Sequence, residues 1–132
     1  MSTPLRFAVL HHTGWPGRPD HFDLLLQFRD ADDDDARVLK AFATRDDRFP
    51  EPGCALQLIE DHRKAYLHFE GALSAGRGTV ARVDGGELLW LQPFDSAATA
   101  LQVLASGSRL RGRYCLRMEK SPLVSLEEIA EL

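Results

Sequence analysis

Apolar and polar residues alternate along most of the chain, which is the pattern of β-strands that bury one face. In residues 21–28, "HFDLLLQF", aromatic and aliphatic side chains form one row, and His21 and Asp23 begin the other. Turn sequences such as "GWPGRPD", "PEPG" and "DGG" separate nine segments of this kind. Short, evenly spaced strands predict an antiparallel barrel or sandwich. The predicted strands are residues 6–10, 21–28, 38–44, 54–60, 65–73, 78–84, 87–94, 101–106 and 111–119.

Helical signals are scarce, and the clearest lies near the C-terminus. In "SPLVSLEEIAEL", Glu128 follows Ser125 by three residues, which is the spacing of a capping box. This spacing predicts one short C-terminal helix, and "DSAATALQ" predicts one or two further helical turns. No repeat or linker divides the sequence, so residues 1–132 are expected to form a single domain, mainly β, with one or two short helices.

Composition narrows the class of protein. The chain is 44% hydrophobic and 27% charged, as is ordinary for a globular domain. Its net charge of −4 argues against non-specific coating of nucleic acid but allows a local basic patch. Cys54 and Cys115 lack the spacing of a metal or disulfide framework, and neither a leader nor a run of about 20 apolar residues is present. These features predict a cytoplasmic protein with no membrane partner.

Three of the five histidines fall within eleven residues, beside a carboxylate. His21 and Asp23 are two apart in a predicted strand, so their side chains project from the same face. If residues 13–20 form a hairpin loop, His12 returns beside His21. Two imidazoles and a carboxylate suit Mn²⁺, Fe²⁺ or Zn²⁺. The alternative is a hydrogen-bonded polar edge without metal, and one residue of register decides whether His11 or His12 faces the cluster.

Basic residues permit two interpretations. In "RLRGRYCLR", the arginines alternate with apolar residues, so they share one face of a strand. This face either follows a nucleic-acid backbone or is an ordinary solvated outer face. On the first interpretation, Arg111 and Arg113 contact phosphate, and Arg63 extends the patch toward His62. Trp15 either stacks on a base or anchors its loop, and the second is the preferred interpretation.

The remaining motifs follow one another in a recognisable order. The chain contains "RFAVLHH", "HFDLLL", "VLKAFAT", "EDHRKAYLHFEG", "GRGTV" and "SRLRGRYCLR". This order resembles the 3′-phosphoesterase domain of bacterial DNA ligase D, whose pattern is "RFVVQ-x-H", "LHYD-x-RLE", "LKSWAVPK", "EDHPLxYxxFEG", "GAGTV" and "L…G.RLxGR(F/W)xL". The succession of motifs, more than any one of them, carries the resemblance, which covers nearly the whole chain. The matching residues are Arg6, Phe7, His12, His21, Phe22, Asp23, Leu39, Lys40, Phe42, Glu60, Asp61, His62, Tyr66, Phe69, Glu70, Gly71, Gly78, Thr79, Val80, Arg109, Leu110, Gly112 and Arg113.

The resemblance implies a small closed β-barrel that removes 3′-phosphates or 3′-ribonucleotides from DNA ends during repair by non-homologous end joining. It implies a divalent metal, Mn²⁺ first and Zn²⁺ second, held by His12, His21 and Asp23. It also implies that His62 is the catalytic residue at the substrate phosphate and that Arg45 replaces a phosphate-binding lysine. The implied partners are a DNA 3′ end and other repair proteins.

The chain departs from the family pattern at phosphate-binding positions. Leu25, two residues after Asp23, and Cys54, eight residues before His62, stand where the family has arginine. Neither side chain can grip a phosphate as a guanidinium does. Two functions are therefore consistent with the sequence. The first is a metal-dependent phosphoesterase. The second is a non-catalytic module that keeps the barrel and metal site and binds nucleic acid or a repair partner.

Overall fold

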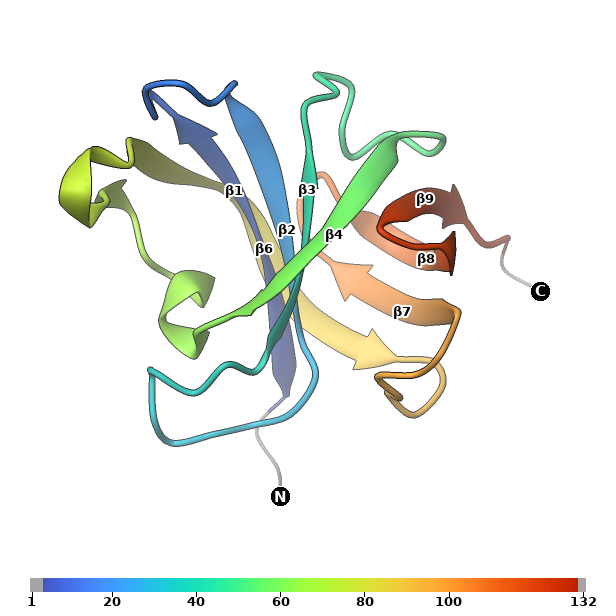
Figure 1. Ribbon diagram of the computed structural model, residues 1–132. Helices are drawn as coiled ribbons and strands as arrows, with labels where there is room; N and C mark the ends of the chain where they lie inside the picture. The colour runs from blue at the N-terminus through green and yellow to red at the C-terminus, as the bar shows by residue number, and fades with distance from the viewer. Residues whose placement is uncertain (1–3, 131–132) are drawn as a thin grey trace.

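Nine strands and two short 3₁₀ turns make up the part of the chain that the computed structural model describes, residues 4–130 (Figure 1). Within these residues no helix is long and apolar enough to cross a membrane. The 3₁₀ turns are η1 (Lys64–Leu67) and η2 (Ser74–Gly76). The strands are β1 (Leu5–Thr13), β2 (His21–Gln27), β3 (Leu39–Thr44), β4 (Ala55–His62), β5 (Gly71–Ala72), β6 (Thr79–Trp90), β7 (Ala100–Ser106), β8 (Arg111–Lys120) and β9 (Leu123–Glu128).

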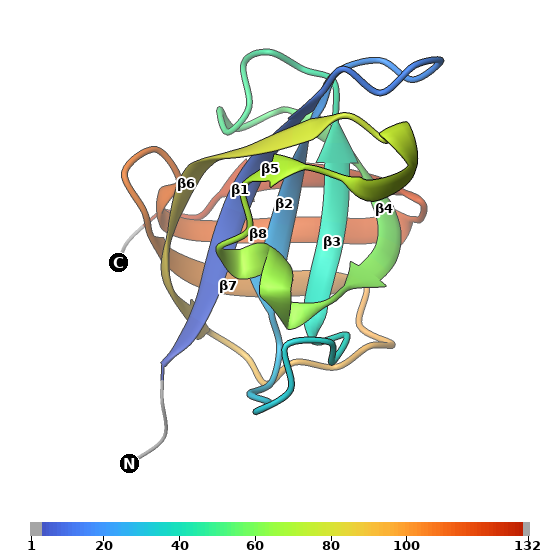
Figure 2. The ribbon, with the colours of Figure 1, turned by 90° about the vertical axis from the view of Figure 1, so that its left-hand side faces the viewer.

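Eight of the strands close into an antiparallel barrel, which confirms the predicted mainly β architecture. The strands pair in the order β1-β2-β3-β4-β9-β8-β7-β6, and β6 pairs back with β1. The short strand β5 adds to the edge of β6. In Figure 2, β7 and β8 cross behind β1, β2 and β3. Closure leaves the eight barrel strands with few unpaired edges, which explains why so short a chain forms a stable sheet.

Strands β1, β2 and β3 are buried on both faces. Their inward residues, such as Phe7, Leu24 and Phe42, join a large apolar core that fills the barrel. Their outward residues, such as Leu10 and Leu25, join a second, smaller core. The segment between β4 and β6, which carries η1, β5 and η2, covers this second core, and Figure 2 shows it crossing in front of the three strands. Burial on both faces accounts for the nearly continuous apolar run in β2.

The predicted C-terminal helix is wrong, because residues 123–128 form strand β9. Val124 and Leu126 point inward, with 2% and 0% exposure, while Ser125 and Glu127 face outward. The sequence has period two as well as capping-box spacing, and pairing with β4 and β8 selects the strand. Residues 95–99 form turns rather than a helix. The only helical elements in residues 4–130 are η1 and η2.

The predicted "DGG" turn and the predicted strand at residues 65–73 are also wrong. Residues 78–84 and 87–94 were expected to be separate strands on either side of a "DGG" turn, but most of this region forms one bent strand, β6. Gly86 lies within it, where a Cβ would come within 2.2 Å of the Ser106 carbonyl oxygen. Glycine therefore permits close approach at a barrel corner rather than marking a hairpin. Residues 65–73 form η1, a connecting segment and β5 instead of one long strand.

Asp84 anchors the loop that joins β7 and β8. Its buried carboxylate accepts hydrogen bonds from the backbone N–H groups of Gly85, Ser108, Arg109 and Leu110, at 2.7–3.0 Å. Burial alone would raise the pKa of Asp84, but the four donors together outweigh it and lower the pKa below its ordinary value. The carboxylate thus accepts the hydrogen bonds of the backbone N–H groups in this turn, in place of backbone carbonyl groups.

We predict that Asp84→Asn lowers the free energy of unfolding by about 2 kcal/mol at neutral pH, because the amide cannot accept the same set of bonds. A depressed folded-state pKa means that the stabilisation is present above the unfolded pKa of about 3.9 and is lost as the pH falls through the folded value. The difference between wild type and variant should therefore narrow below about pH 4 in urea titrations. Asp32→Asn, at an exposed loop position, is the control; an equal loss there would contradict the prediction.

Candidate metal centre

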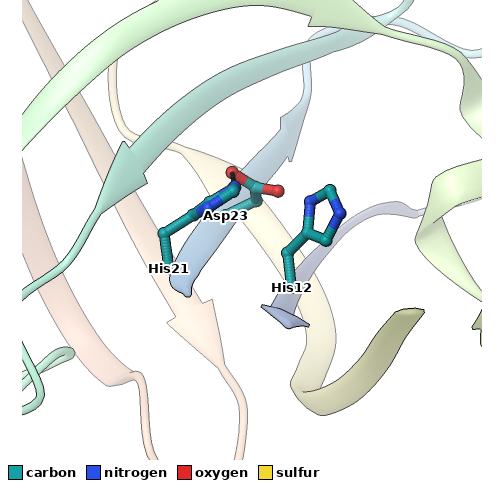
Figure 3. A group of neighbouring side chains, drawn as sticks. All are labelled: His12, His21 and Asp23. Atoms are coloured by element: carbon teal, nitrogen blue, oxygen red, sulfur yellow. Dashed lines mark ion pairs between the residues drawn. The ribbon is translucent and has the colours of Figure 1, made fainter. Parts of the chain in front are cut away.

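The β1–β2 hairpin brings two histidines and an aspartate together. His12 near the end of β1 pairs with His21 at the start of β2, and Asp23 follows on the same face. One potential ligand atom from each of the three side chains lies within 4.8 Å of the others. Figure 3 shows His12 approaching from one strand and His21 with Asp23 from the other. His11 faces the opposite way and stacks on Phe22, with ring centroids 4.5 Å apart, so the register selects His12.

Backbone carbonyls fix both imidazole rings. The Nε2–H of His12 donates to the carbonyl oxygen of Arg77 at 2.6 Å, and the Nδ1–H of His21 donates to that of Pro19 at 3.1 Å. Each bond uses one ring nitrogen and leaves the other with its lone pair. Metal-binding histidines are commonly oriented in this way, because the outer hydrogen bond sets the tautomer. The two rings are therefore prepared to donate to a cation.

Asp23 has a buried carboxylate oxygen without a hydrogen-bond partner. The residue is 5% exposed, and among the described residues no group donates a hydrogen bond to its Oδ1. That atom lies 3.4 Å from Nε2 of His21. The contact with Asp23 raises the pKa of His21, although burial opposes the shift. A buried, unpaired carboxylate oxygen is costly, and a bound cation would remove the cost. The donor set of this cluster therefore fits a divalent metal ion.

The cluster lies in a cleft of about 480 Å³ whose walls are rich in arginine. Tyr66 and His62 line one side, and Glu60 is the one carboxylate besides Asp23 among the lining residues. The arginines of the lining are Arg18, Arg37, Arg63 and Arg77. Four arginines and two carboxylates line the cleft, so its lining carries a net positive charge despite the negative charge of the whole chain. Three of the guanidinium groups also contact protein acceptors: Arg37 donates to the Asp61 carbonyl oxygen, Arg77 donates to Ser74, and Arg63 pairs with Asp35. Such a cleft favours an anionic ligand.

Trp15 closes the end of the cleft nearest the hairpin loop. Its ring stacks on His12 at a centroid distance of 5.3 Å, and the guanidinium carbon of Arg18 lies 4.5 Å above the ring. The indole is thus held between a metal-cluster ring and an arginine. This packing agrees with the preferred interpretation that Trp15 anchors its loop.

Gly78 allows the η2 turn to reach the cluster. Its φ is +86°, and a Cβ there would lie 2.2 Å from the Thr13 carbonyl oxygen and 2.8 Å from the Trp15 nitrogen. A larger residue would push the turn away from the end of β1. Because the neighbouring Arg77 supplies the carbonyl that orients His12, the close approach of Gly78 contributes to the geometry of the cluster.

The structure brings some of the predicted site residues together and separates others. His62 and Arg63 line the cleft of the cluster. Arg45 lies in an adjoining groove, and Arg111 and Arg113 are exposed on β8 and do not line the cleft. Their role as phosphate contacts remains a prediction. Sequence reasoning missed three cleft residues, Arg18, Arg37 and Arg77, because they come from loops whose paths no motif or period reveals.

Comparison with known proteins does not assign the chain to a family. No protein-family model matches the chain, and no curated protein sequence matches it.

We predict that the protein binds one Mn²⁺ or Zn²⁺ ion and that His12→Ala weakens binding at least tenfold, because a ligand is lost. Isothermal calorimetry on the metal-free protein measures both quantities. His11→Ala is the matched control, since the neighbouring ring stacks on Phe22 instead of facing the cluster. Equal weakening by both variants, or no binding to the wild type, would show that this cluster is not a metal site.

Proposed function

We propose that the protein is a divalent-metal-dependent phosphoesterase that acts on the 3′ ends of nucleic acid. The observation that carries the proposal is the cluster of His12, His21 and Asp23 at the base of an arginine-lined cleft that also contains His62. Metal ligands beside a positively charged cleft are the minimum that phosphoester hydrolysis needs. The choice of a 3′ end, of Mn²⁺ as the metal and of a role in DNA repair rests on the resemblance of the sequence motifs.

Each group in the cleft has a distinct task under this proposal. A bound divalent ion would neutralise charge on the phosphate oxygens and lower the pKa of a water molecule. Arg18 would hold the remaining oxygens and fix the orientation of the ester. Arg37 and Arg77, whose guanidinium groups also donate to the Asp61 carbonyl oxygen and to Ser74, would add positive charge beside it. Tyr66 and Trp15 narrow the cleft on two sides. Chemistry of this type depends mostly on positioning and on charge stabilisation.

His62 is suited to protonate the oxygen that leaves. Its Nδ1–H donates to the Glu60 carbonyl oxygen at 2.8 Å, which leaves Nε2 to exchange a proton with a ligand. The edge of the ring contacts Tyr66, with centroids 5.5 Å apart. When the P–O bond breaks, the oxygen on the 3′ carbon needs a proton, and a positioned imidazolium supplies it.

The two missing family arginines do not leave the cleft without cations. Leu25 is fully buried in the second core, under η1, and Cys54 is buried in the barrel core. An arginine at either position would need a path out of an apolar cluster. The guanidinium groups of the cleft come instead from the hairpin loop and from other connecting segments. This supports a rearranged phosphate clamp rather than a deleted one.

A non-catalytic binding module remains the second candidate. The observation that favours it is that Leu25 and Cys54 stand at positions where the family pattern has arginine. Such a module would keep the metal cluster and bind a nucleic-acid end or a repair protein without turnover. Binding and hydrolysis must therefore be measured separately.

We predict slow, Mn²⁺-dependent release of phosphate from a single-stranded oligonucleotide that carries a 3′-phosphate. His62→Ala should lower the rate by about 10²-fold or more without weakening metal binding, because the variant lacks only the proton donor. His68→Ala is the matched control, since that histidine is exposed and does not line the cleft. Phosphate release is followed by a colorimetric assay with a 5′-phosphorylated oligonucleotide beside it.

The result that supports hydrolysis is release from the 3′ end that disappears in Asp23→Asn. Activity that persists in Asp23→Asn indicates a contaminating phosphatase. Metal binding and oligonucleotide binding without any release would identify the protein as the binding module instead.

A further inference from the structure

A second groove adjoins the metal cleft on the outside of the barrel. It has a volume of about 340 Å³, and its lining residues come from the start of β2, the end of β3 and the starts of β4 and β9. Its floor contains the small side chains of Ala43 and Ala55 together with Leu123. Leu123 is 62% exposed, one of two large hydrophobic residues in the described chain with so open a surface. The floor of the groove is therefore apolar and accessible.

The groove and the cleft are continuous. Arg18, His21 and Ala43 line both of them, so His21 presents one edge to the metal cluster and another to the groove. Arg18 stands at their junction, where its guanidinium covers Trp15. A ligand longer than a single phosphoester would therefore extend from the cleft into this groove without crossing another element.

The charge of the groove is positive. Arg18 and Arg45 line it, and none of its lining residues is a carboxylate. In residues 4–130 neither arginine forms an ion pair, whereas Arg48, Arg63 and Arg117 each do. Gln57, exposed on β4 opposite Leu123 of β9, adds an amide that donates and accepts hydrogen bonds. Two cations beside an apolar floor match a chain of phosphates that carries apolar sugar and base faces.

We infer that this groove binds the nucleotides immediately 5′ of the reacting end, so that a single strand enters the metal cleft along the groove. The inference rests on the proposed function for its direction, since the 3′ end lies at the metal. Arg18 and Arg45 contact successive phosphates, while Leu123 and the two alanines contact sugar and base surfaces. Because the contacts are to phosphate and to apolar faces, the groove binds without strong base preference.

The test compares affinity with chain length. Oligothymidylates of one, two, four and eight nucleotides, each ending in a non-hydrolysable 3′-phosphonate, compete with a fluorescent eight-nucleotide probe in the presence of Mn²⁺. We expect the affinity of the wild type to rise about tenfold between one and four nucleotides as phosphate contacts are added, and then to level off. Leu123→Glu should remove most of this rise, because a carboxylate in the groove repels the phosphates.

Leu89→Glu is the matched control. Leu89 is 59% exposed on the outer face of β6, and it lines neither the groove nor the cleft, so the length dependence should survive there. Gln57→Glu adds the same charge to the groove from β4 and provides a second variant if Leu123→Glu fails to fold. The inference is supported if affinity no longer rises with chain length in either groove variant but still rises with chain length in Leu89→Glu.

The binding and hydrolysis measurements distinguish a failure of the inference from a failure of the proposed function. Hydrolysis of 3′-phosphates with affinity that does not depend on length would overturn the groove and leave the enzyme intact. Length-dependent affinity that Leu123→Glu removes, without any hydrolysis, would support the groove and refute the enzyme. The inference would also be overturned if Leu89→Glu removed the rise of affinity with chain length as fully as Leu123→Glu does. Preference of the groove for an acidic peptide over the oligonucleotide would overturn the inference as well.

Discussion

The antiparallel pairing of β1 with β2 is the interaction on which the site depends. It sets His12 opposite His21, and the period of the strand then sets Asp23 on the same face. The hairpin is held on both sides, since its inner face packs in the barrel and its outer face lies under the segment between β4 and β6. A slip of one residue would turn His11 toward the cleft and His12 toward the barrel core, so the two cores fix the register of the cluster.

The buried carboxylates of Asp84 and Asp23 differ in how many of their hydrogen bonds the protein supplies. Asp84 accepts four backbone hydrogen bonds, and its environment lowers its pKa. Asp23 is buried as deeply but has an oxygen with no donor, in a cleft next to two oriented imidazoles. The protein thus supplies every partner to the first and leaves one place open at the second. An open place of this kind is what a cation-binding site requires, because the ion itself completes the set.

The sequence predicted the sheet better than its connections. The predicted strands at residues 21–28 and 111–119 agree with β2 and β8 almost to the residue, and the predicted hairpin brings His12, His21 and Asp23 together. Errors arose where two patterns coincide: the capping-box spacing at Ser125 also has period two, and Gly86 marks a close approach instead of a turn. Three of the four arginines that line the cleft, Arg18, Arg37 and Arg77, were not predicted, because a loop path depends on tertiary packing that no local period encodes.

The cleft arginines come from loops, and the second core explains why the strand position Leu25 is apolar. Leu25 belongs to the row that packs under η1, so a charge there would have to pass through that apolar layer. Loop arginines meet no such cost, since Arg18 and Arg63 are exposed and also line the cleft. They are also held loosely, by an indole face in one case and by Asp35 and Tyr66 in the other. Arginines on loops can adapt to more variation in an anionic ligand than arginines on strands, because side-chain packing at the surface, and not the register of the barrel, fixes their geometry.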